Sequence, residues 1–518
     1  MSRTSFPRSL IGCVGACWLV CGCVAVNPDS DYARARQTII ETTGSRSVFA
    51  PEDAAAVETA VAERMKGGIT LDEAVEICLL NNPSLQAAFL NIGIARADLV
   101  QSGLLSNPTL ALSIAFPESG GRSNIQATFA QSIVELWQVP VRRKAASRAL
   151  NASILDLARQ AAQTTIDTKS AYFSAIAAEQ TLMIAQENRR LAQQLLEAAE
   201  DRQKAGAVGE LDVNLVRGTL YFAELETQRS RLDSSTARRR LATLLGLTAD
   251  AQHLALVSAL SPTSPLQLDG SHITEIALSH RLDIQAARQE TEGSRARLAL
   301  EYRKMLPEVA IGASLERTER RALPGRNIAA DTARASVAAG SLSAPEIQSR
   351  GQRDMERNRD IDSIFGPALS LTLPIFDQNQ AQIAKAKYTY EQSLRQLDAL
   401  ERSVVQQVRQ GVDQAETARR VAEYFRGKLL PQAQANLELA RESYKAGRAS
   451  LIVVLDAQRV LLSTRRDAIA AQRDSAITLA ELERLVSKPL VFILEAPSTA
   501  QPADDSRAQS LENSNASP

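Results

Sequence analysis

Residues 76–111 read EICLLNNPSLQAAFLNIGIARADLVQSGLLSNPTLA, and residues 275–310 repeat their plan as EIALSHRLDIQAARQETEGSRARLALEYRKMLPEVA. The two segments align without a gap at a spacing of 199 positions. Each starts with a helical pattern, reaches a proline (Pro108 or Pro307), and continues into alternating apolar and polar residues. Because the context repeats along with the identities, the sequence predicts an internally duplicated fold.

Alternating residues predict four β-strands, at 109–116, 124–134, 307–315 and 369–375. The first is the most regular, whereas Gln131 falls on the apolar side of the second. This period suits a strand of a membrane β-barrel and, equally, a half-buried strand of a soluble sheet. An open sheet edge is not tolerated in lipid, and single-chain barrels begin at about eight strands. Membrane strands would therefore have to be pooled by several chains, and three chains would give twelve.

Very long helical patterns follow each strand pair, at 141–205 and 377–446. Each stretch could reach about 100 Å at the rise of an α-helix. They end at Gly206 in KAGAVGELDVNL and at Gly447 in YKAGRASLIVVLD, and a second long helix follows each glycine. Pro431 is expected to bend its helix rather than end it. The sequence thus predicts two long α-helical hairpins that reverse at glycine turns.

These patterns set the expected domain organisation. The first structural repeat covers residues 68–248 and the second covers 249–490, each in the order helix–strand–strand–helix–turn–helix. Within the second repeat, the polar segment 317–365 is expected to be a long surface loop. Residues 491–518 have the composition of a disordered polar tail.

The N-terminus has the pattern of an exported lipoprotein. Arg3 and Arg8 precede an apolar run that is too short for a good transmembrane helix, so residues 1–22 are expected to be a signal peptide. The sequence before Cys23 resembles a bacterial lipobox, which predicts lipidation of Cys23 and a lipidated N-terminal segment over 23–67. The alternative is ordinary signal cleavage nearby without a lipid.

Composition argues against several classes of function. Acidic and basic residues balance at 59 each, which argues against nucleic-acid binding carried by global charge, though not against local charged patches. Three histidines, scarce methionine and no nucleotide-binding, hydrolase or metalloprotease motif argue against an enzyme, a cofactor and a metal site. Aromatic residues make up 4% of the chain, as suits long helices packed through small and branched aliphatic side chains. Cys78 lies in an apolar helical pattern and is expected to be a core residue.

In their order and spacing these features resemble the TolC-like outer-membrane efflux and secretion channels. The resemblance covers residues 68–490 and rests on the duplicated plan and four short motifs: LDEA at 71–74, NPSL at 82–85, LPIF at 373–376, and Tyr444-x-x-Gly447 followed by VLDAQ at 454–458. It implies a mainly α fold with four β-strands per chain, a homotrimer with a twelve-stranded β-barrel in the outer membrane, and a periplasmic α-helical tunnel. It further implies docking at the tunnel tip with a periplasmic adaptor (membrane fusion protein) and an inner-membrane pump, for which the channel is a passive exit duct.

The resemblance also implies site residues. Gly206 and Gly447 correspond to the turn glycines at the periplasmic tip, and Asp212 and Asp456 to acidic residues of the pore constriction. Val453 stands where the family has a further aspartate. Three copies of one carboxylate around a narrow pore would favour cations. The alternative for Asp456 is a solvated carboxylate near the positive end of a helix.

The cargo and one competing function stay open. PIFDQNQ at 374–380 resembles the cation and heavy-metal branch of the family and points weakly to metal-cation export. The alternative function is a lipid-anchored periplasmic coiled-coil adaptor or scaffold protein. Val24 lacks the aspartate that often retains lipoproteins at the inner membrane, which favours sorting to the outer membrane.

Overall fold

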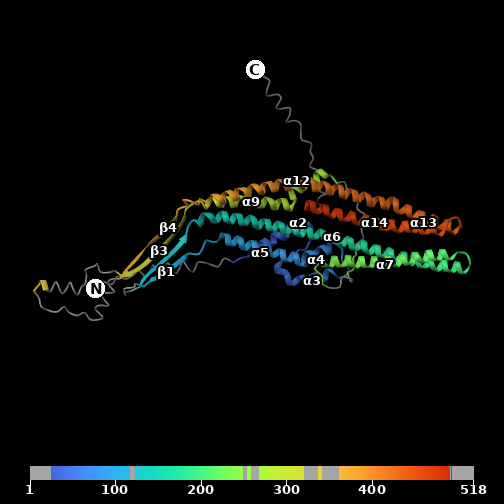
Figure 1. Ribbon diagram of the computed structural model, residues 1–518, viewed down its shortest axis with the longest axis horizontal. Coiled ribbons are helices and arrows are strands. Elements are labelled where there is room, and N and C mark those ends of the chain that lie inside the picture. The colour runs from blue at the N-terminus through green and yellow to red at the C-terminus, as the bar shows by residue number, and fades with distance from the viewer. Residues whose placement is uncertain are drawn as a thin grey trace, which may run out of the picture. The chain divides into compact units, whose positions relative to one another are not determined.

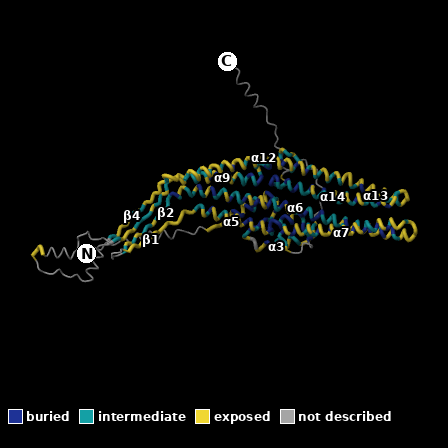
Figure 2. Tube along the Cα trace, viewed as in Figure 1, coloured by how far each residue is buried: buried dark blue, intermediate teal, exposed yellow. Residues whose placement is uncertain are grey.

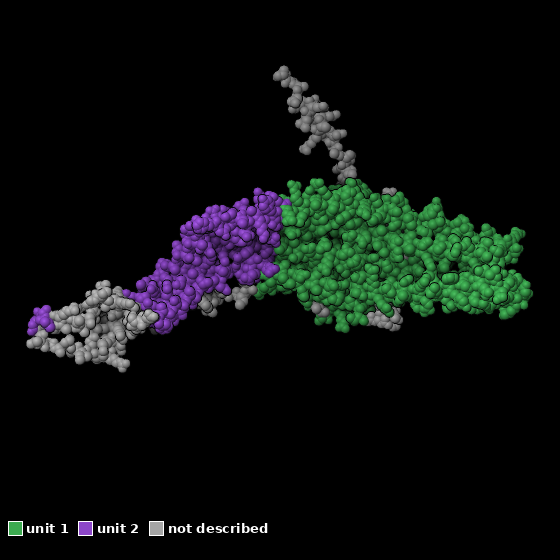
Figure 3. All heavy atoms as spheres, in the orientation of Figure 1, with its two compact units in different colours: residues 1–97, 148–291, 392–518 green, residues 98–147, 292–391 purple. Residues whose placement is uncertain are grey.

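The computed structural model describes residues 25–116, 123–248, 254–257, 268–319, 337–340, 361–489 and 492 (Figure 1). The chain divides into two compact units (Figure 3). The first comprises residues 1–97, 148–291 and 392–518, and the second residues 98–147 and 292–391. Both units draw on both halves of the sequence.

The segment that precedes the first repeat is helical. It contains α2 (Asp29–Thr43), the short turn η1 (Pro51–Asp53) and α3 (Ala54–Arg64). The Tyr32 ring lies 6.4 Å from the Phe89 ring, measured between centroids. The buried Asp31 carboxylate lies 3.4 Å from the Arg96 guanidinium. The N-terminal segment is therefore part of the packed core of the first unit.

The helices that open the two repeats confirm the duplication. They are α4 (Leu71–Asn81) and α5 (Pro83–Gly103) in the first repeat, and α8 (Gly270–His280) and α9 (Leu282–Arg303) in the second. α4 and α8 begin and end 199 positions apart, which is the spacing of the sequence repeat. Thr70 and Glu73 form a capping box at the start of α4, and the Asp269 side chain caps α8.

Asn82, the first residue of the NPSL motif, and the preceding Asn81 bind the end of a distant helix. The Asn81 amide donates to the backbone oxygens of Leu245 and Gly246, and the Asn82 amide donates to that of Leu244. These carbonyls end a long helix and have no partner within it. Gly246 has a φ of +68°, and a Cβ there would lie 2.3 Å from the Asn81 oxygen. The motif therefore joins the α4–α5 junction to the end of the first hairpin.

Four antiparallel strands form one sheet in the second unit. They are β1 (Thr109–Ala115), β2 (Asn124–Ser132), β3 (Glu308–Glu319) and β4 (Ile361–Thr372), in the order β1-β2-β3-β4. This confirms the four predicted strands. The loop expected at 317–365 is shorter than predicted, because β3 continues to Glu319 and β4 already begins at Ile361. The two strands stay paired without a break into that segment, where Arg317 lies opposite Ser363.

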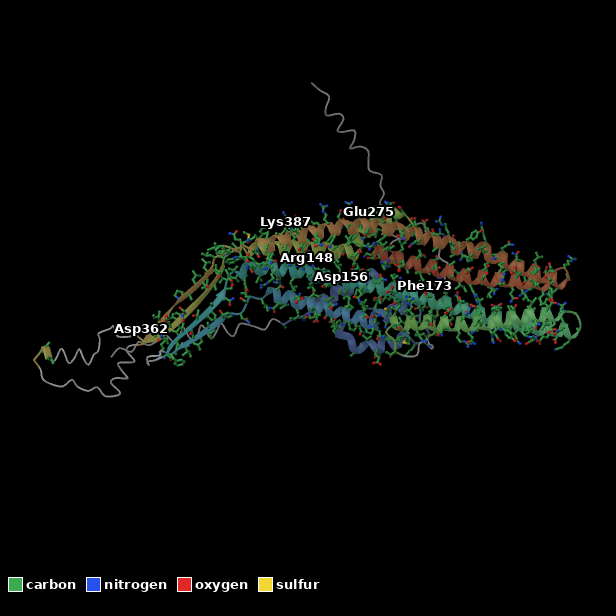
Figure 4. The ribbon with its side chains drawn as sticks, viewed as in Figure 1. Arg148, Asp156, Phe173, Glu275, Asp362 and Lys387 are labelled. Atoms are coloured by element: carbon green, nitrogen blue, oxygen red, sulfur yellow. The ribbon has the colours of Figure 1, made fainter. Side chains whose placement is uncertain are left out.

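The register gives the sheet one apolar face. Leu112 lies opposite Ala127, which lies opposite Leu315, which lies opposite Phe365. Several large apolar residues of the strands are exposed in the chain (Figure 2), with Leu110 at 74% and Leu369 at 73%. The other face carries small or polar residues that include Ser314 and Ser370. Asp362, near the start of β4, lies on that face in the register (Figure 4). Gln131 lies on the apolar face at the end of β2, where its amide donates to the oxygens of Ser106 and Ser132.

The long helices form two hairpins. The first consists of α6 (Glu135–Lys204) and α7 (Glu210–Leu244), and the second of α12 (Gln380–Tyr424), the π-helix η3 (Phe425–Leu429), α13 (Leu430–Lys445) and α14 (Leu451–Val486). The buried residues of α7 include Val213, Val216, Leu220 and Ala223, spaced by three and four. This is the spacing of helix-on-helix seams. No described helix combines the length and the apolar character that a membrane crossing requires.

Candidate functional site

Both hairpins reverse through the same turn geometry. Gly206 and Gly447 have φ values of 72° and 70°, in the left-handed region that glycine adopts without strain. The Ala207 N–H donates to the Arg202 oxygen, and the Arg448 N–H donates to the Ser443 oxygen, each at 2.8 Å. A hydrogen bond from the residue after the glycine back to the carbonyl five positions earlier is typical of a helix that ends in a left-handed glycine. Both predicted glycines therefore occupy the helix reversals.

The ends of the two hairpins pack on each other within the first unit. Leu451, the first residue of α14, is buried in a cluster with Leu196 of α6 and Val216 of α7. Leu455 and Tyr444 pack against the same cluster. The apolar run that follows Gly447 thus fixes the second hairpin to the first. That role explains why the returning helix begins with apolar residues.

Polar contacts link the hairpins next to this cluster. The Arg202 Nη1 donates to the Tyr444 hydroxyl at 2.8 Å. Further along, the Gln458 amide donates to the Asn188 Oδ1 at 3.2 Å. Two ion pairs continue the series, Arg465–Glu187 at 3.5 Å and Arg466–Glu226 at 2.9 Å. We call these four contacts the inter-hairpin contacts.

Sequence reasoning missed the partners in these contacts. Tyr444 and Gln458 belong to the motif that runs from Tyr444 through VLDAQ at 454–458. Their partners Arg202 and Asn188 lie on α6, more than 200 positions earlier in the chain. Nothing in the local sequence pattern of α6 distinguishes these two residues from the other polar residues of a long helix. Only the packing of one hairpin on the other brings them to their partners.

Asp456 lies on the second turn of α14, with its side chain 58% exposed. Its Oδ1 accepts a hydrogen bond from the Arg459 Nη2 at 2.7 Å, one turn further along the same helix. The carboxylate also lines a groove of about 560 Å³ along α7 and α14, together with Phe222 and Ile452. Its negative charge is therefore partly offset by an arginine from its own helix.

Asp212 has a different environment. It lies in the first turn of α7, where a carboxylate suits the positive end of the helix dipole. It has no ion-pair partner among the residues that the structure describes, and it does not line the groove that contains Asp456. One chain therefore does not bring the two aspartates into one cluster. Val453, the departure from the family pattern, is 48% exposed.

The remaining predicted site residue is Cys23, which lies outside the described residues. Cys78, predicted to be a core residue, is fully buried in α4. Across the described ranges, no group of three or more histidine, cysteine, aspartate or glutamate residues could hold a metal ion.

The PIFDQNQ pattern serves the junction between β4 and α12. Asn379 has a φ of 61°, and its amide donates to the Glu301 backbone oxygen at 2.9 Å and to the Glu301 Oε2 at 2.8 Å. Burial raises the pKa of Glu301, but the hydrogen bond from Asn379 and the neighbouring Lys304 outweigh it, so the pKa is lowered overall. The Asp377 carboxylate accepts from the Asn379 N–H. These contacts are architectural and include no metal-binding cluster.

Comparison with known proteins identifies the family of this chain. The sequence model described as "Outer membrane efflux protein" matches residues 74–247 and 273–487, which hold both sets of strands and both hairpins. The chain belongs to this family. It is an outer-membrane efflux channel protein whose helical hairpins extend into the periplasm.

Individual relatives align with this efflux protein over most of its length. The cobalt-zinc-cadmium resistance protein CzcC of Cupriavidus metallidurans is 23% identical over 77% of this chain and 85% of its own length. The pyoverdine export outer membrane protein OpmQ of Pseudomonas aeruginosa is 25% identical over 78% and 82%. The Campylobacter jejuni CmeC outer membrane channel superposes with a TM-score of 0.64 at 16% identity, over 86% and 90%. The structural likeness supports the shared fold.

Proposed function

We propose that three copies of this efflux protein form a trimeric exit duct, with a twelve-stranded β-barrel in the outer membrane and a tunnel of helical hairpins in the periplasm. The observation that carries the proposal is the sheet with one exposed apolar face. Within the described residues β1 pairs only with β2 and β4 pairs only with β3, so both edges are open. Because lipid does not tolerate open edges, β1 of one copy would pair with β4 of the next.

The duct is passive in this proposal. A periplasmic adaptor and an inner-membrane pump deliver cargo to the hairpin ends, where Gly206 and Gly447 form the periplasmic tip. The inter-hairpin contacts hold the tip narrow, and Asp212 and Asp456 contribute carboxylates to the constriction. No catalytic step is required, since the pump supplies the driving force.

We further propose that the cargo is a metal cation. The support is the likeness to the cobalt-zinc-cadmium resistance protein. Because a pyoverdine export protein matches over a similar share of the chain, the cargo needs a direct test. A deletion strain should become sensitive to cobalt, zinc or cadmium salts and recover with the intact gene. Unchanged metal tolerance, with loss of siderophore export instead, would contradict the metal assignment.

The proposed duct is tested by the mass of the purified protein in detergent and by its conductance in a planar bilayer. We expect a trimer and discrete conductance steps. A non-conducting monomer would contradict both the trimer and the duct. A lipid-anchored periplasmic adaptor, the alternative function, has no use for an exposed apolar sheet face and does not account for the family match.

The lipid anchor is a separate proposal. Acylation of Cys23 would hold the N-terminus at the membrane, a few residues before α2 begins at Asp29. A palmitate analogue should label the wild-type protein but not Cys23→Ser. The Cys23→Ser protein should still fractionate with the outer membrane, because the barrel holds it there. Label retained by Cys23→Ser would overturn the assignment of the anchor.

A further inference from the structure

Four cations gather near the start of α6, where the sheet passes into the long helices (Figure 1). We call them the junction cations: Arg142, Arg143 and Lys144 of α6, and Arg303 at the end of α9. Arg143 and Lys144 are exposed. Arg143 lies against the end of α5, because a Cβ at Gly103 would be 3.9 Å from its Cδ. Within the described residues none of the four forms an ion pair, so the protein does not neutralise their charge.

Backbone carbonyls hold two of the junction cations in place. The Arg142 Nε donates to the Ser102 oxygen at 2.8 Å, and its Nη2 donates to the Leu104 oxygen, both at the end of α5. The Arg303 Nη1 donates to the Trp137 oxygen in the first turn of α6. A carbonyl accepts a hydrogen bond without carrying a full negative charge, so both guanidinium groups are fixed but not neutralised.

The carboxylates on these turns already have other partners. The Glu135 Oε2 accepts from the Ser106 N–H at 2.6 Å. The Glu301 carboxylate accepts from the Asn379 amide at 2.8 Å and from the Lys304 ammonium at 2.7 Å. Both acids are therefore occupied in joining helices to strands, and the start of α6 keeps an excess of positive charge.

Large apolar side chains are exposed beside the junction cations. They are Leu104 and Leu105 after α5, Leu136 and Trp137 in α6, and Tyr302 in α9. The exposed apolar face of the sheet begins a few residues away, at Leu110 of β1. Aromatic rings next to lysine and arginine are typical of the boundary between a membrane and water. The apolar side chains thus continue the sheet face that the proposed barrel turns to lipid.

We propose that the junction cations and Trp137 form a binding site for the phosphate groups of anionic phospholipids in the periplasmic leaflet of the outer membrane. The periplasmic leaflet is the one from which the helical hairpins emerge. The acyl chains would lie against Leu136 and the apolar sheet face, while Arg143 and Lys144 donate to the phosphate. An anionic headgroup is favoured over a zwitterionic one because each cation near the membrane surface adds to the attraction. This inference rests on the proposed function, which places the sheet in the membrane.

Trp137 makes the site directly measurable. The sequence has two tryptophans, and Trp18 lies in the expected signal peptide, so Trp137 reports alone in the processed protein. The purified protein is reconstituted in phosphatidylcholine bilayers that contain a minor fraction of a lipid with brominated acyl chains. That lipid is either phosphatidylglycerol or phosphatidylcholine, and bromine quenches tryptophan fluorescence only at short range. We expect stronger quenching by the brominated phosphatidylglycerol.

A pair of double variants separates the site from general surface charge. Arg143→Gln with Lys144→Gln removes the two exposed junction cations and leaves the guanidinium–carbonyl contacts in place. It should reduce the preference for phosphatidylglycerol by about fivefold for each charge removed. Arg189→Gln with Arg190→Gln is the matched control, because these are also adjacent exposed cations on α6 but lie far along the helix from the sheet. It should leave the preference unchanged, and an equal loss in both double variants would overturn the site.

The remaining outcomes distinguish this inference from the proposed function. Equal quenching of the wild-type protein by the two brominated lipids would overturn the lipid site and leave the barrel intact. Relief of the phosphatidylglycerol quenching by inorganic phosphate would assign the cations to a soluble anion and overturn the lipid site as well. Absence of quenching by either lipid would place Trp137 away from the bilayer, which would contradict the proposed barrel together with the inference.

Discussion

Arg202 of α6 contacts Tyr444 of α13 in two ways. Its Nη1 donates to the tyrosine hydroxyl at 2.8 Å, and its guanidinium carbon lies 5.3 Å from the centroid of the tyrosine ring. The hydrogen bond depends on the hydroxyl, whereas the cation–π contact depends on the ring. The two contributions can therefore be removed one at a time.

Tyr444→Phe should loosen the hairpin ends without unfolding them. The ring keeps its place, and the loss of one exposed hydrogen bond to a charged donor costs about 1 kcal/mol, or about a fivefold change in an opening equilibrium. We expect a matching rise in open probability in planar bilayers. Tyr221→Phe alters a tyrosine that is 62% exposed on α7 and should change nothing. Equal open probabilities for both variants would contradict a holding role for Tyr444.

The ion pair between Asp456 and Arg459 predicts opposite effects on ion selectivity. Asp456→Asn removes a carboxylate from the proposed constriction and should lower the preference for cations over anions. Arg459→Gln removes the cation 2.7 Å from that carboxylate and should raise the same preference. Reversal potentials in a salt gradient measure both. Unchanged selectivity in both variants would place Asp456 away from the ion path, and Asp212→Asn would then become the decisive variant.

Gly312 in β3 should tolerate no side chain. A Cβ there would lie 1.8 Å from the Phe129 carbonyl oxygen, which belongs to the backbone of the neighbouring strand. Gly312→Ala should therefore force β2 and β3 apart and abolish the oligomer that survives mild detergent on a gel. Gly366→Ala in β4 is the matched control, because no atom lies within 4 Å of its added Cβ. A stable Gly312→Ala oligomer would show that the strands adjust.

Cys78 predicts a specific dependence of stability on alkaline pH. Burial raises the pKa of its thiol to about 11, from an ordinary value of 9.0. Between these values the unfolded chain loses the proton first, so the free energy of unfolding falls as the pH rises, by about 2–3 kcal/mol in total. Thermal unfolding across this window should be steeper in pH for the wild type than for Cys78→Ala. Equal slopes would contradict the shifted pKa.

Local rules made much of the fold predictable from the sequence. Alternation placed the strands, and the match between residues 76–111 and 275–310 anticipated helices that begin and end at the same spacing. Gly206 and Gly447 were predictable because helix reversal needs left-handed backbone angles at one residue.

The rest depended on contacts between distant segments. Pro431 predicted a bend, but not that the bend would take the form of a π-turn at Phe425–Leu429. Gln131 looked like an error in an apolar pattern until its bond to the Ser106 oxygen explained it. The partners of Tyr444 and Gln458 could not be predicted because the packing of one hairpin on the other selects them.

The hydrogen bonds between Asn379 and Glu301 affect how relatives of this chain should be assigned to cargo branches of the family. In the sequence, PIFDQNQ resembled a signature of a cargo branch, yet its asparagine fixes a sharp change of backbone direction and its aspartate supports that asparagine. Classifying proteins by this pattern would group them by how a strand turns into a helix. Phenotype, rather than that short pattern, should therefore decide which substrate is assigned to an unfamiliar member.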